Sequence, residues 1–364
     1  MFRLPHRYAL FIAFACLAGI SLATSAPAYA GDNTARVFPT YAVQDGNNVV
    51  VPVHVWVFEH EDDLLRKAAI KPLEAILDIE DDSPEEAIFN RRMLDFMVDN
   101  ERGEDVWVTL SGPGIEAKEQ KLGETPANGH LQRSITIPFT RTPGATRFRF
   151  ELAVRVEDMG TVKVIDVPLI EPEGVTVVSD VDDTIKITNV VDKKELLANS
   201  FTREFRMAPG MSAFFTRLGA RYRPQFHYLS ASPWNLQSEL DTWRRNDNFP
   251  DAVWHLRIFR TKDFQRTARF LKGSEGHKVG ELEALFKRFP KRTFILIGDS
   301  GEADPEVYGR VARNFPASIH HIYIREVPGA TNAAARFKAA FKGLDATRWT
   351  TFSEPTGLPA GGKE

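Results

Sequence analysis

A short run of β-branched residues that ends abruptly in carboxylates constrains this chain more than any other feature. Residues 175–184 have the sequence VTVVSDVDDT, so Asp180, Asp182 and Asp183 closely follow the strand-forming residues. Such a run is typical of a strand buried on both faces of a parallel sheet. The carboxylates would then lie at the carboxyl edge of the sheet, where open α/β folds bind their ligands.

This concentration of negative charge predicts a bound cation. Carboxylates so close together repel one another unless a cation or a shared proton offsets the cost. Ligands that are all oxygen favour a hard divalent ion, and Mg²⁺ is the first choice. On residues 175–184 alone, a solvated turn and a Ca²⁺ loop remain as alternatives.

Two later segments offer groups that suit phosphate. Ser230 follows a strand expected at 225–229, where its hydroxyl and the following amides could hold an anion at a helix start. Pro233 suits a first helical position, which makes Ser232 the expected N-cap. Lys278 precedes an amphipathic helix, and a lysine can balance the oxygens of a phosphoryl group. A single lysine is more commonly just solvated, so Lys278 gains weight only beside the acidic segments.

A second acidic strand end follows residues 294–297, which have the sequence FILI. Gly298 would allow close backbone approach, and Asp299 lies directly past the buried strand, which makes Asp299 a candidate metal ligand. Asp304 precedes Pro305 and therefore suits an N-cap. It could also assist the metal through water.

Taken together, the four segments resemble the haloacid-dehalogenase-like (HAD-like) phosphohydrolase superfamily. The superfamily pattern is Asp-x-Asp-x-Thr, then a strand-end Ser, a Lys, and Gly-Asp with a further Asp. Here it runs through Asp180, Asp182, Thr184, Ser230, Lys278, Asp299 and Asp304. Within the superfamily, residues 174–341 look like the catalytic domain of the phosphatidate phosphatases related to the yeast actin-patch protein. An export signal and the lack of a long Pro-rich tail argue against a cytosolic, actin-linked role.

The resemblance implies a two-step reaction on a phosphate ester. Asp180 would attack phosphorus and form an aspartyl-phosphate. Asp182 would protonate the leaving alkoxide and later deprotonate water. A neighbouring anion and partial burial would give Asp182 the raised pKa that a general acid needs.

The same resemblance implies the metal and substrate ligands. Mg²⁺ would be held mainly by Asp180 and Asp299, with the Asp182 backbone carbonyl. The expected metal ligands are Asp180, Asp182, Asp299 and Asp304. The expected substrate-binding residues are Thr184, Ser230 and Lys278. Of these, Thr184 is expected chiefly to order the loop, together with Asp183.

The first thirty residues predict export. Arg3 and Arg7 precede an apolar run over 8–22, and Ala28-Tyr29-Ala30 supplies a cleavage site before Gly31. The run is shorter than the roughly 20 residues of a membrane span. The one cysteine, Cys16, raises a lipoprotein signal as an alternative, but it lies inside the apolar run and the residues before it fit poorly. We therefore expect a periplasmic or secreted protein.

The rest of the chain divides into two patterns. Residues 31–171 alternate as short strands, which predicts a β-rich, sandwich-like domain with a helical insertion at 64–98. Residues 172–346 alternate strands with helices, which predicts an α/β, HAD-like, doubly wound and mainly parallel sheet. The stretches 186–210 and 234–278 are too short for a large cap domain. A Gly- and Pro-containing tail is expected to be flexible over 347–364.

An uncapped site would admit bulky phosphomonoesters, so phosphatidate at a membrane surface is the leading substrate. A soluble phosphomonoester or a phosphoprotein is the first alternative, and an envelope-binding β domain with an inert α/β half is the second. Residues 196–201, with Arg203 and Arg206, could contact acyl chains and phosphate or form a packed flap. A net charge of −3 does not suit nucleic-acid binding. No segment after the signal is apolar enough to span a membrane, and the oligomeric state is left open.

Overall fold

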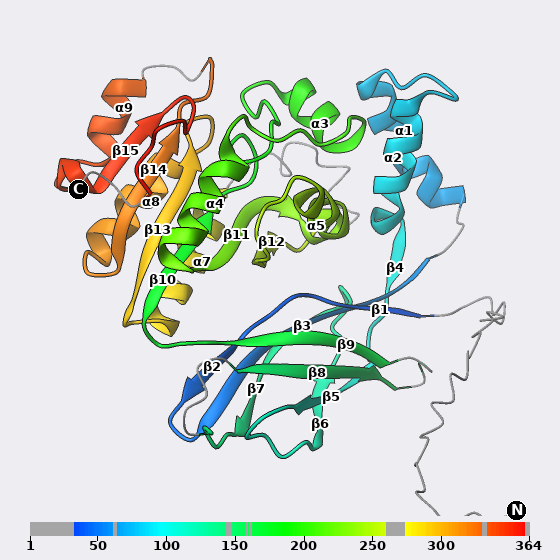
Figure 1. Cartoon of the computed structure of the whole chain (residues 1–364). Coiled ribbons are helices and arrows are strands. Elements are labelled where there is room, and N and C mark those ends of the chain that lie inside the picture. Colours follow the sequence, from blue (N-terminus) through cyan, green and yellow to red (C-terminus); the bar gives the residue numbers. More distant parts are fainter. Residues whose placement is uncertain are drawn as a thin grey trace, which may run out of the picture. The chain divides into compact units, whose positions relative to one another are not determined.

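The computed structural model describes residues 33–60, 64–142, 148–157, 159, 162–259, 274–329 and 333–360. The predicted signal peptide therefore lies outside the described residues. Residues Asn33–Glu364 form one compact unit, so a domain boundary at 171/172 remains a prediction. We call residues 33–171 the β portion and residues 172–360 the α/β portion (Figure 1).

The β portion is built on a nine-stranded, mainly antiparallel sheet in the order β1-β3-β2-β9-β8-β5-β6, with β4 and β7 also paired to β3. Its strands are β1 (Thr34–Val37), β2 (Ala42–Asp45), β3 (Asn48–His60), β4 (Val98–Asn100), β5 (Asp105–Ser111), β6 (Glu119–Glu124), β7 (His130–Pro138), β8 (Arg149–Val156) and β9 (Val162–Ile170). Side chains alternate between buried and partly exposed along β3 and β5. This two-residue period places one face of each strand in a common core of valines, leucines and isoleucines.

A helical insertion separates β3 from β4, as the sequence predicted. It comprises α1 (Leu64–Leu77), α2 (Pro84–Met93) and the 3₁₀ turn η1 (Leu94–Phe96). Ser83 caps α2 by accepting the Glu86 backbone N–H at 3.1 Å, with Pro84 at the first helical position. The sequence Ser83-Pro84-Glu85-Glu86 is typical of such a helix start.

The α/β portion contains a six-stranded parallel sheet in the order β12-β11-β10-β13-β14-β15, so the α/β fold class is confirmed. Its strands are β10 (Gly174–Ser179), β11 (Gln225–Pro233), β12 (Val253–Arg257), β13 (Arg292–Asp299), β14 (Ile319–Arg325) and β15 (Trp349–Phe352). The described helices are α3 (Lys193–Phe201), α4 (Met211–Tyr222), α5 (Gln237–Asn246), α7 (Ser274–Arg288), α8 (Asp304–Asn314) and α9 (Ala333–Ala340), with 3₁₀ turns η2 (Trp234–Leu236) and η4 (Ala346–Arg348).

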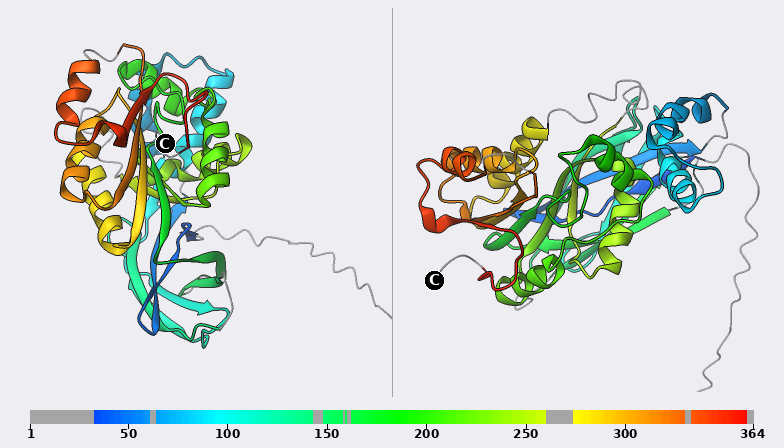
Figure 2. Two further views of the ribbon diagram at one scale, coloured as in Figure 1. Left: turned by 60° about the vertical axis from the view of Figure 1, so that its left-hand side comes forward. Right: turned by 90° about the horizontal axis from the view of Figure 1, so that it is seen from above.

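Two apolar cores cover opposite faces of this sheet. Consecutive residues of β10 divide between them, because Val177 packs with Phe214 of α4 while Val178 belongs to the core that includes Leu282 of α7. Figure 2 shows helices on both sides of the sheet. A strand buried on both faces suits the β-branched run found at 175–178. Among the described helices, none is long and apolar enough to cross a membrane.

The expectation of a flexible tail from residue 347 is wrong for most of that segment. Residues Trp349–Phe352 pair with β14 as β15, and Phe352 is buried. Farther on, the Tyr323 hydroxyl donates to the Pro359 carbonyl at 2.6 Å, and Arg217 Nη2 donates to the Pro355 carbonyl at 2.8 Å. The tail supplies hydrogen bonds that an unpaired β14 edge would lack. Its Gly- and Pro-containing composition suggested flexibility and gave no sign of this pairing.

Candidate active site

The two predicted acidic strand ends meet at the carboxyl edge of the parallel sheet. β10 and β13 are neighbours, with Ser179 opposite Ile297, so the residues that follow them emerge side by side. The Asp180 N–H donates to the Ile297 carbonyl at 2.8 Å and extends this pairing by one residue. Asp180 and Asp299 are 1% and 0% exposed, which makes this edge a buried anionic site rather than a solvated turn.

A third carboxylate and a lysine complete the centre. Oxygens of Asp180, Asp299 and Asp304 all lie within 4.8 Å of one another. Lys278, in the first turns of α7, places its Nζ 2.8 Å from Asp180 Oδ1, 2.5 Å from Asp304 Oδ1 and 3.0 Å from Glu302 Oε2. The predicted residues Asp180, Lys278, Asp299 and Asp304 are thus brought together, and Glu302 joins them without having been predicted.

This centre holds more negative than positive charge. The pKa of Asp180 lies well above its usual range because burial penalises the charged form; Lys278 offsets part of the rise, and Asp304 and Asp299 add to it. Burial, and then the charge of Asp304, likewise raises the pKa of Asp299. The buried Asp180 Oδ1 accepts no hydrogen bond from the described residues despite its closeness to Lys278. An oxygen-only ligand set with uncompensated charge fits a hard divalent cation.

The Asp304 side chain is not the helix cap that Pro305 suggested. The N-cap position of α8 falls on Ala303, and Asp304 is the first residue of the helix. Its carboxylate instead accepts from Lys278 and, at 3.2 Å, from the Asp299 backbone N–H. The fully buried ammonium of Lys278 is a stronger partner than a helix-terminal amide, and only the tertiary structure brings it within reach.

Thr184 and Asp183 order the loop that carries the acids. Thr184 Oγ1 donates to Asp180 Oδ2 at 2.9 Å and to Asp299 Oδ2 at 3.3 Å. The Asp183 carboxylate accepts three backbone N–H groups at 2.6–2.8 Å, from Thr188, Asn189 and Val190. These bonds hold the loop in a closed turn in which Asp183 itself has a φ of 55°.

The Asp182 carboxylate is not a member of the three-carboxylate cluster and is held by a separate set of donors. Its Oδ1 lies 2.7 Å from Lys186 Nζ and accepts from Thr188 Oγ1 at 2.8 Å. Its Oδ2 accepts from Ser230 Oγ at 3.0 Å and Ser232 Oγ at 2.9 Å. The structure therefore does not bring the Asp182 carboxylate into the predicted set of metal ligands.

These contacts shift the pKa of Asp182 in the direction opposite to the one that the sequence suggested. Burial alone would raise the pKa of Asp182, but the Lys186 ammonium and the hydroxyl donors of Thr188 and Ser232 outweigh it and lower this pKa to about 2. The prediction of a raised pKa is therefore wrong for this state of the protein. Its physical cause is Lys186, a residue that the sequence argument did not consider.

Besides Glu302, sequence reasoning missed Lys186 and Ser232 as residues of the site. Ser232 is not an N-cap, because β11 continues to Pro233 and the following turn has no side-chain cap. In an extended strand, residues two apart point to the same side, so the Ser230-x-Ser232 spacing could have indicated that both hydroxyls reach one group. Lys186 follows Asp182 by four residues between apolar neighbours, and its ammonium is almost completely buried.

Residues 185–208, which we call the flap, pack against the site instead of lying open. Leu197 and Phe201 of α3 are buried. Asn199 Nδ2 donates to the Thr188 carbonyl at 3.0 Å, and the Ile187 N–H donates to the Arg206 carbonyl at 2.8 Å. The packed-flap alternative therefore describes this segment, although Arg206 itself is exposed.

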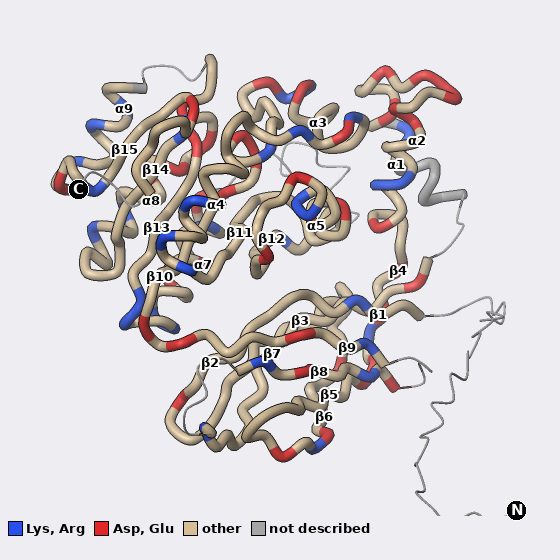
Figure 3. The backbone as a smooth tube through the Cα atoms, in the orientation of Figure 1, with Lys and Arg blue, Asp and Glu red and all other residues tan. Residues whose placement is uncertain are grey.

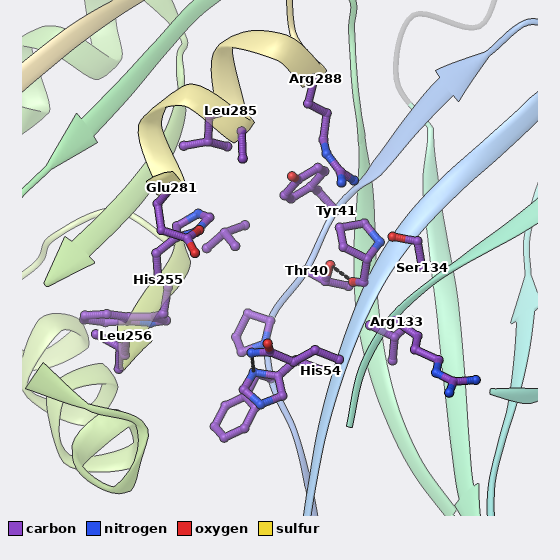
Figure 4. A pocket seen from close by; sticks show the side chains of 18 of the residues that line it. Thr40, Tyr41, His54, Arg133, Ser134, His255, Leu256, Glu281, Leu285 and Arg288 are labelled. Atoms are coloured by element: carbon purple, nitrogen blue, oxygen red, sulfur yellow. Dashed lines mark hydrogen bonds and ion pairs between the residues drawn. The ribbon is translucent and has the colours of Figure 1, made fainter. Parts of the chain in front are cut away.

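A cavity of about 390 Å³ lies apart from this centre (Figure 4). It is lined by residues of both portions, with Val53 and Trp234 among its apolar residues and His255, Glu281 and Arg288 among its polar ones. His255 Nδ1 and Glu281 Oε2 are 2.8 Å apart. None of the predicted metal or substrate ligands lines this cavity.

Gly298 gives Asp304 room to approach the strand, as predicted. A Cβ at Gly298 would lie 2.4 Å from Asp304 Oδ2 and 2.7 Å from Tyr308 Cε2. We expect Gly298→Ala to displace Asp304 and to lower the free energy of unfolding by about 1–3 kcal/mol in a denaturant titration. Gly280→Ala is the control, because its Cβ would meet nothing within 4 Å. A wild-type free energy of unfolding in Gly298→Ala would contradict this geometry.

Comparison with known proteins finds a family model that matches the segment carrying this site. Fold and site together define an α/β protein with a buried acid–lysine centre at the carboxyl edge of a parallel sheet. Residues 175–326 match the family described as phosphatidate phosphatase APP1, catalytic domain. The resemblance to the APP1-related phosphatidate phosphatases, drawn from the motifs of this segment, is confirmed by this match.

Two fungal relatives and one solved structure are similar over different lengths. An uncharacterized protein of Schizosaccharomyces pombe is 28% identical over 258 residues, covering 66% of this chain and 41% of that protein. Phosphatidate phosphatase APP1 of Saccharomyces cerevisiae is 33% identical over 159 residues, covering 43% and 26%. The chain thus spans less than half the length of either relative. The match to a solved structure, a Bacteroides uniformis beta-glucuronidase, covers 81% of this chain and 36% of the glucuronidase chain at 9% identity. Its TM-score of 0.23 is too low to inform the fold.

Proposed function

We propose that this protein is a Mg²⁺-dependent phosphatidate phosphatase that works through an aspartyl-phosphate and releases diacylglycerol and phosphate. The observation that carries the proposal is the buried Asp180 beside Lys278, inside an oxygen-only cluster at the carboxyl edge of the sheet. The match of residues 175–326 to the APP1 catalytic domain supports phosphatidate as the substrate. We also propose an HAD-like, doubly wound assignment for the α/β portion, supported by its parallel strand pairing and its motif order, and a sandwich-like assignment for the β portion, supported by the sequence pattern.

In the first step, an Asp180 carboxylate oxygen attacks phosphorus. A new O–P bond forms as the bond from phosphorus to the alkoxide of diacylglycerol breaks. Thr184 orients the nucleophile through its 2.9 Å hydrogen bond to Asp180 Oδ2. The ammonium of Lys278, 2.8 Å from the other oxygen, is placed to offset the charge that develops on the phosphoryl oxygens.

Asp182 handles the protons of both steps. It gives a proton to the leaving alkoxide, and in the second step it takes one from the water that attacks the aspartyl-phosphate. Its low pKa keeps it ionised in this structure, which suits the second step. For the first step it must take up a proton, which a phosphoryl anion brought beside it would favour, because a neighbouring negative charge raises a carboxyl pKa. Ser230 and Ser232 hold its Oδ2 throughout.

The donor set fits the proposed metal. Asp180, Asp299 and Asp304, with the Asp182 carbonyl, would hold Mg²⁺, whose charge would stabilise the transferring phosphoryl group. In the protein itself, the Lys278 ammonium contacts Asp180 and Asp304 of this set, and also Glu302, and so offsets part of the repulsion between the acids.

Assays on presented and soluble substrates test the proposal. We expect Mg²⁺-dependent release of phosphate from phosphatidate in mixed vesicles, faster than from a panel of soluble nucleotide, sugar and protein phosphates, and abolished by excess chelator. Preference for the soluble panel would end the lipid assignment. Full activity in chelator would end the metal assignment, and inactivity on every ester would favour an inert α/β portion.

We also propose that residues 1–30 are removed on export and that the protein is periplasmic or secreted. The support is the charged start, apolar run and small-residue cleavage site of the sequence. N-terminal sequencing should find Gly31 or a residue within one or two of it. A mature chain that begins at Met1, or that carries lipid on Cys16, would contradict export as a soluble protein.

A further inference from the structure

The helical insertion of the β portion contacts the flap of the α/β portion. Both α1 and α2 pack against α3, as Figure 1 shows. Asn235, which follows the Ser230 strand, donates from Nδ2 to the Asp95 carbonyl at 2.6 Å and ties the insertion to the site from a second side. The turn that joins α1 to α2 is acidic (Figure 3), so this end of the insertion is unsuited to an anionic membrane surface.

Arg92 of α2 makes the most buried of these contacts. The residue is 1% exposed, and its Nη1 donates to the carbonyls of Ser200 at 3.1 Å and Arg203 at 2.7 Å. Its Nε lies 3.6 Å from Glu239. A fully buried arginine costs desolvation energy unless it is well paired, and here the partners are backbone carbonyls at the end of α3 and the start of the next turn.

Arg92 shares one aromatic ring with the lysine that holds Asp182. The guanidinium carbon of Arg92 lies 3.7 Å from the centre of the Phe205 ring, and Lys186 Nζ lies 4.9 Å from the same centre. Both distances are within the range of a cation–π interaction. Lys186 then reaches Asp182 at 2.7 Å and donates to Thr188 Oγ1 at 2.6 Å. A continuous set of contacts therefore joins Arg92, Phe205, Lys186 and Asp182.

We propose that Arg92 and Phe205 are positioning residues for the reaction, and that through them the helical insertion holds Lys186 against Asp182. This inference rests on the proposed function. Lys186 has a flexible stem, so its ammonium needs a fixed surface to stay on one carboxylate oxygen. Phe205 is that surface. Arg92 fixes Phe205 by stacking on its ring and by donating hydrogen bonds to the backbone that precedes Phe205. The insertion thereby contributes to catalysis without touching the substrate.

A leaving-group comparison tests the proposal, because only a poor leaving group needs the proton of Asp182. Phe205→Leu and Arg92→Met are compared on an alkyl phosphate, short-chain phosphatidate in micelles, and on an activated aryl phosphate, p-nitrophenyl phosphate. General acid catalysis contributes roughly 10²–10⁴-fold and requires the Asp182 carboxyl at the leaving oxygen. Although a displaced Lys186 would favour the protonated form of Asp182, we expect the misplaced carboxyl to lower kcat/KM on the order of tenfold more for the alkyl ester. Phe205→Tyr keeps the aromatic ring, so its ratio of kcat/KM for the two esters should equal that of the wild type.

Arg91→Met is the matched control. Arg91 is the neighbouring residue and pairs with the same Glu239, at 3.1 Å, but its side chain is about half exposed and is not among the cations on the Phe205 ring. It should leave the ratio of the two substrates unchanged. If circular dichroism shows that Arg92→Met does not fold, the comparison of Phe205→Leu with Phe205→Tyr tests the proposal.

The outcomes separate this inference from the proposed function. Equal losses on both esters, or no loss in Phe205→Leu, would overturn the positioning role while leaving the phosphatase intact. A wild-type protein that hydrolyses neither ester would overturn the proposed function and this inference with it. A selective loss on the alkyl ester that Phe205→Tyr reverses would support both.

Discussion

Replacing Asp180 by asparagine is expected to abolish phosphatase activity and the covalent intermediate together. The substitution removes the charged oxygen that attacks phosphorus and one of the three carboxylates in the metal cluster. Loss of a nucleophile that works as part of a unit typically costs roughly 10⁴–10⁶-fold in kcat, so activity should fall to background. Steady-state rates with an aryl phosphate in saturating Mg²⁺ provide the measurement, and intact-mass spectrometry after brief exposure to the same ester detects any adduct.

The fold should survive this change, which makes the result interpretable. In Asp180→Asn the new side chain keeps the shape of the old one, and its amide oxygen can still accept the hydrogen bond from the Thr184 hydroxyl. The change also removes one of several carboxylates around a single lysine, so like-charge repulsion in the metal-free protein decreases. We expect the thermal midpoint without metal to equal or exceed that of the wild type. A phosphoryl adduct on the Asp180→Asn protein would show that another residue is the nucleophile.

The parts of the site that could be predicted were those written into local sequence. The β-branched run at 175–178 and the apolar run at 294–297 predicted two buried strands, and β10 and β13 contain them. Because parallel neighbours end at the same edge, the placement of Asp180 and Asp299 followed from strand order alone. Gly298 could be interpreted for the same reason, since a strand end that must admit another group has no space for a Cβ.

The sequence predictions that were wrong concern side chains that could hydrogen-bond either to a local partner or to a distant one. Ser232 and Asp304 each precede a proline and suit a helix cap, yet Asp182 and Lys278 hold them instead. A distant buried charge can outweigh a cap, which contributes only about 1 kcal/mol. The predicted pKa direction for Asp182 was wrong for a related reason. Lys186 lies between apolar neighbours in the sequence, and only the folded loop brings its ammonium to the Asp182 carboxylate.

Replacing Asp182 by asparagine is expected to trap the aspartyl-phosphate. An aryl phosphate needs little protonation of its leaving group, so Asp180 should still attack it. Hydrolysis then lacks its general base, and turnover should fall by roughly 10²–10⁴-fold. Intact-mass spectrometry should find the phosphoryl adduct accumulating on this variant, and peptide mapping should assign it to Asp180. An adduct on any other residue, or turnover at the wild-type rate, would refute the assigned roles.

The contacts of Asp182 supply a control that separates chemistry from stability in this variant. Asp182→Asn leaves the buried Lys186 ammonium without its 2.7 Å carboxylate partner, and breaking a buried pair costs roughly 3–5 kcal/mol in the free energy of unfolding. Asp182→Asn combined with Lys186→Met removes that unpaired charge and should recover much of the stability in a denaturant titration. The double variant should still accumulate the adduct, because the missing base is not restored. If stability and hydrolysis instead returned together, Asp182 would hold the loop in place without acting as the base.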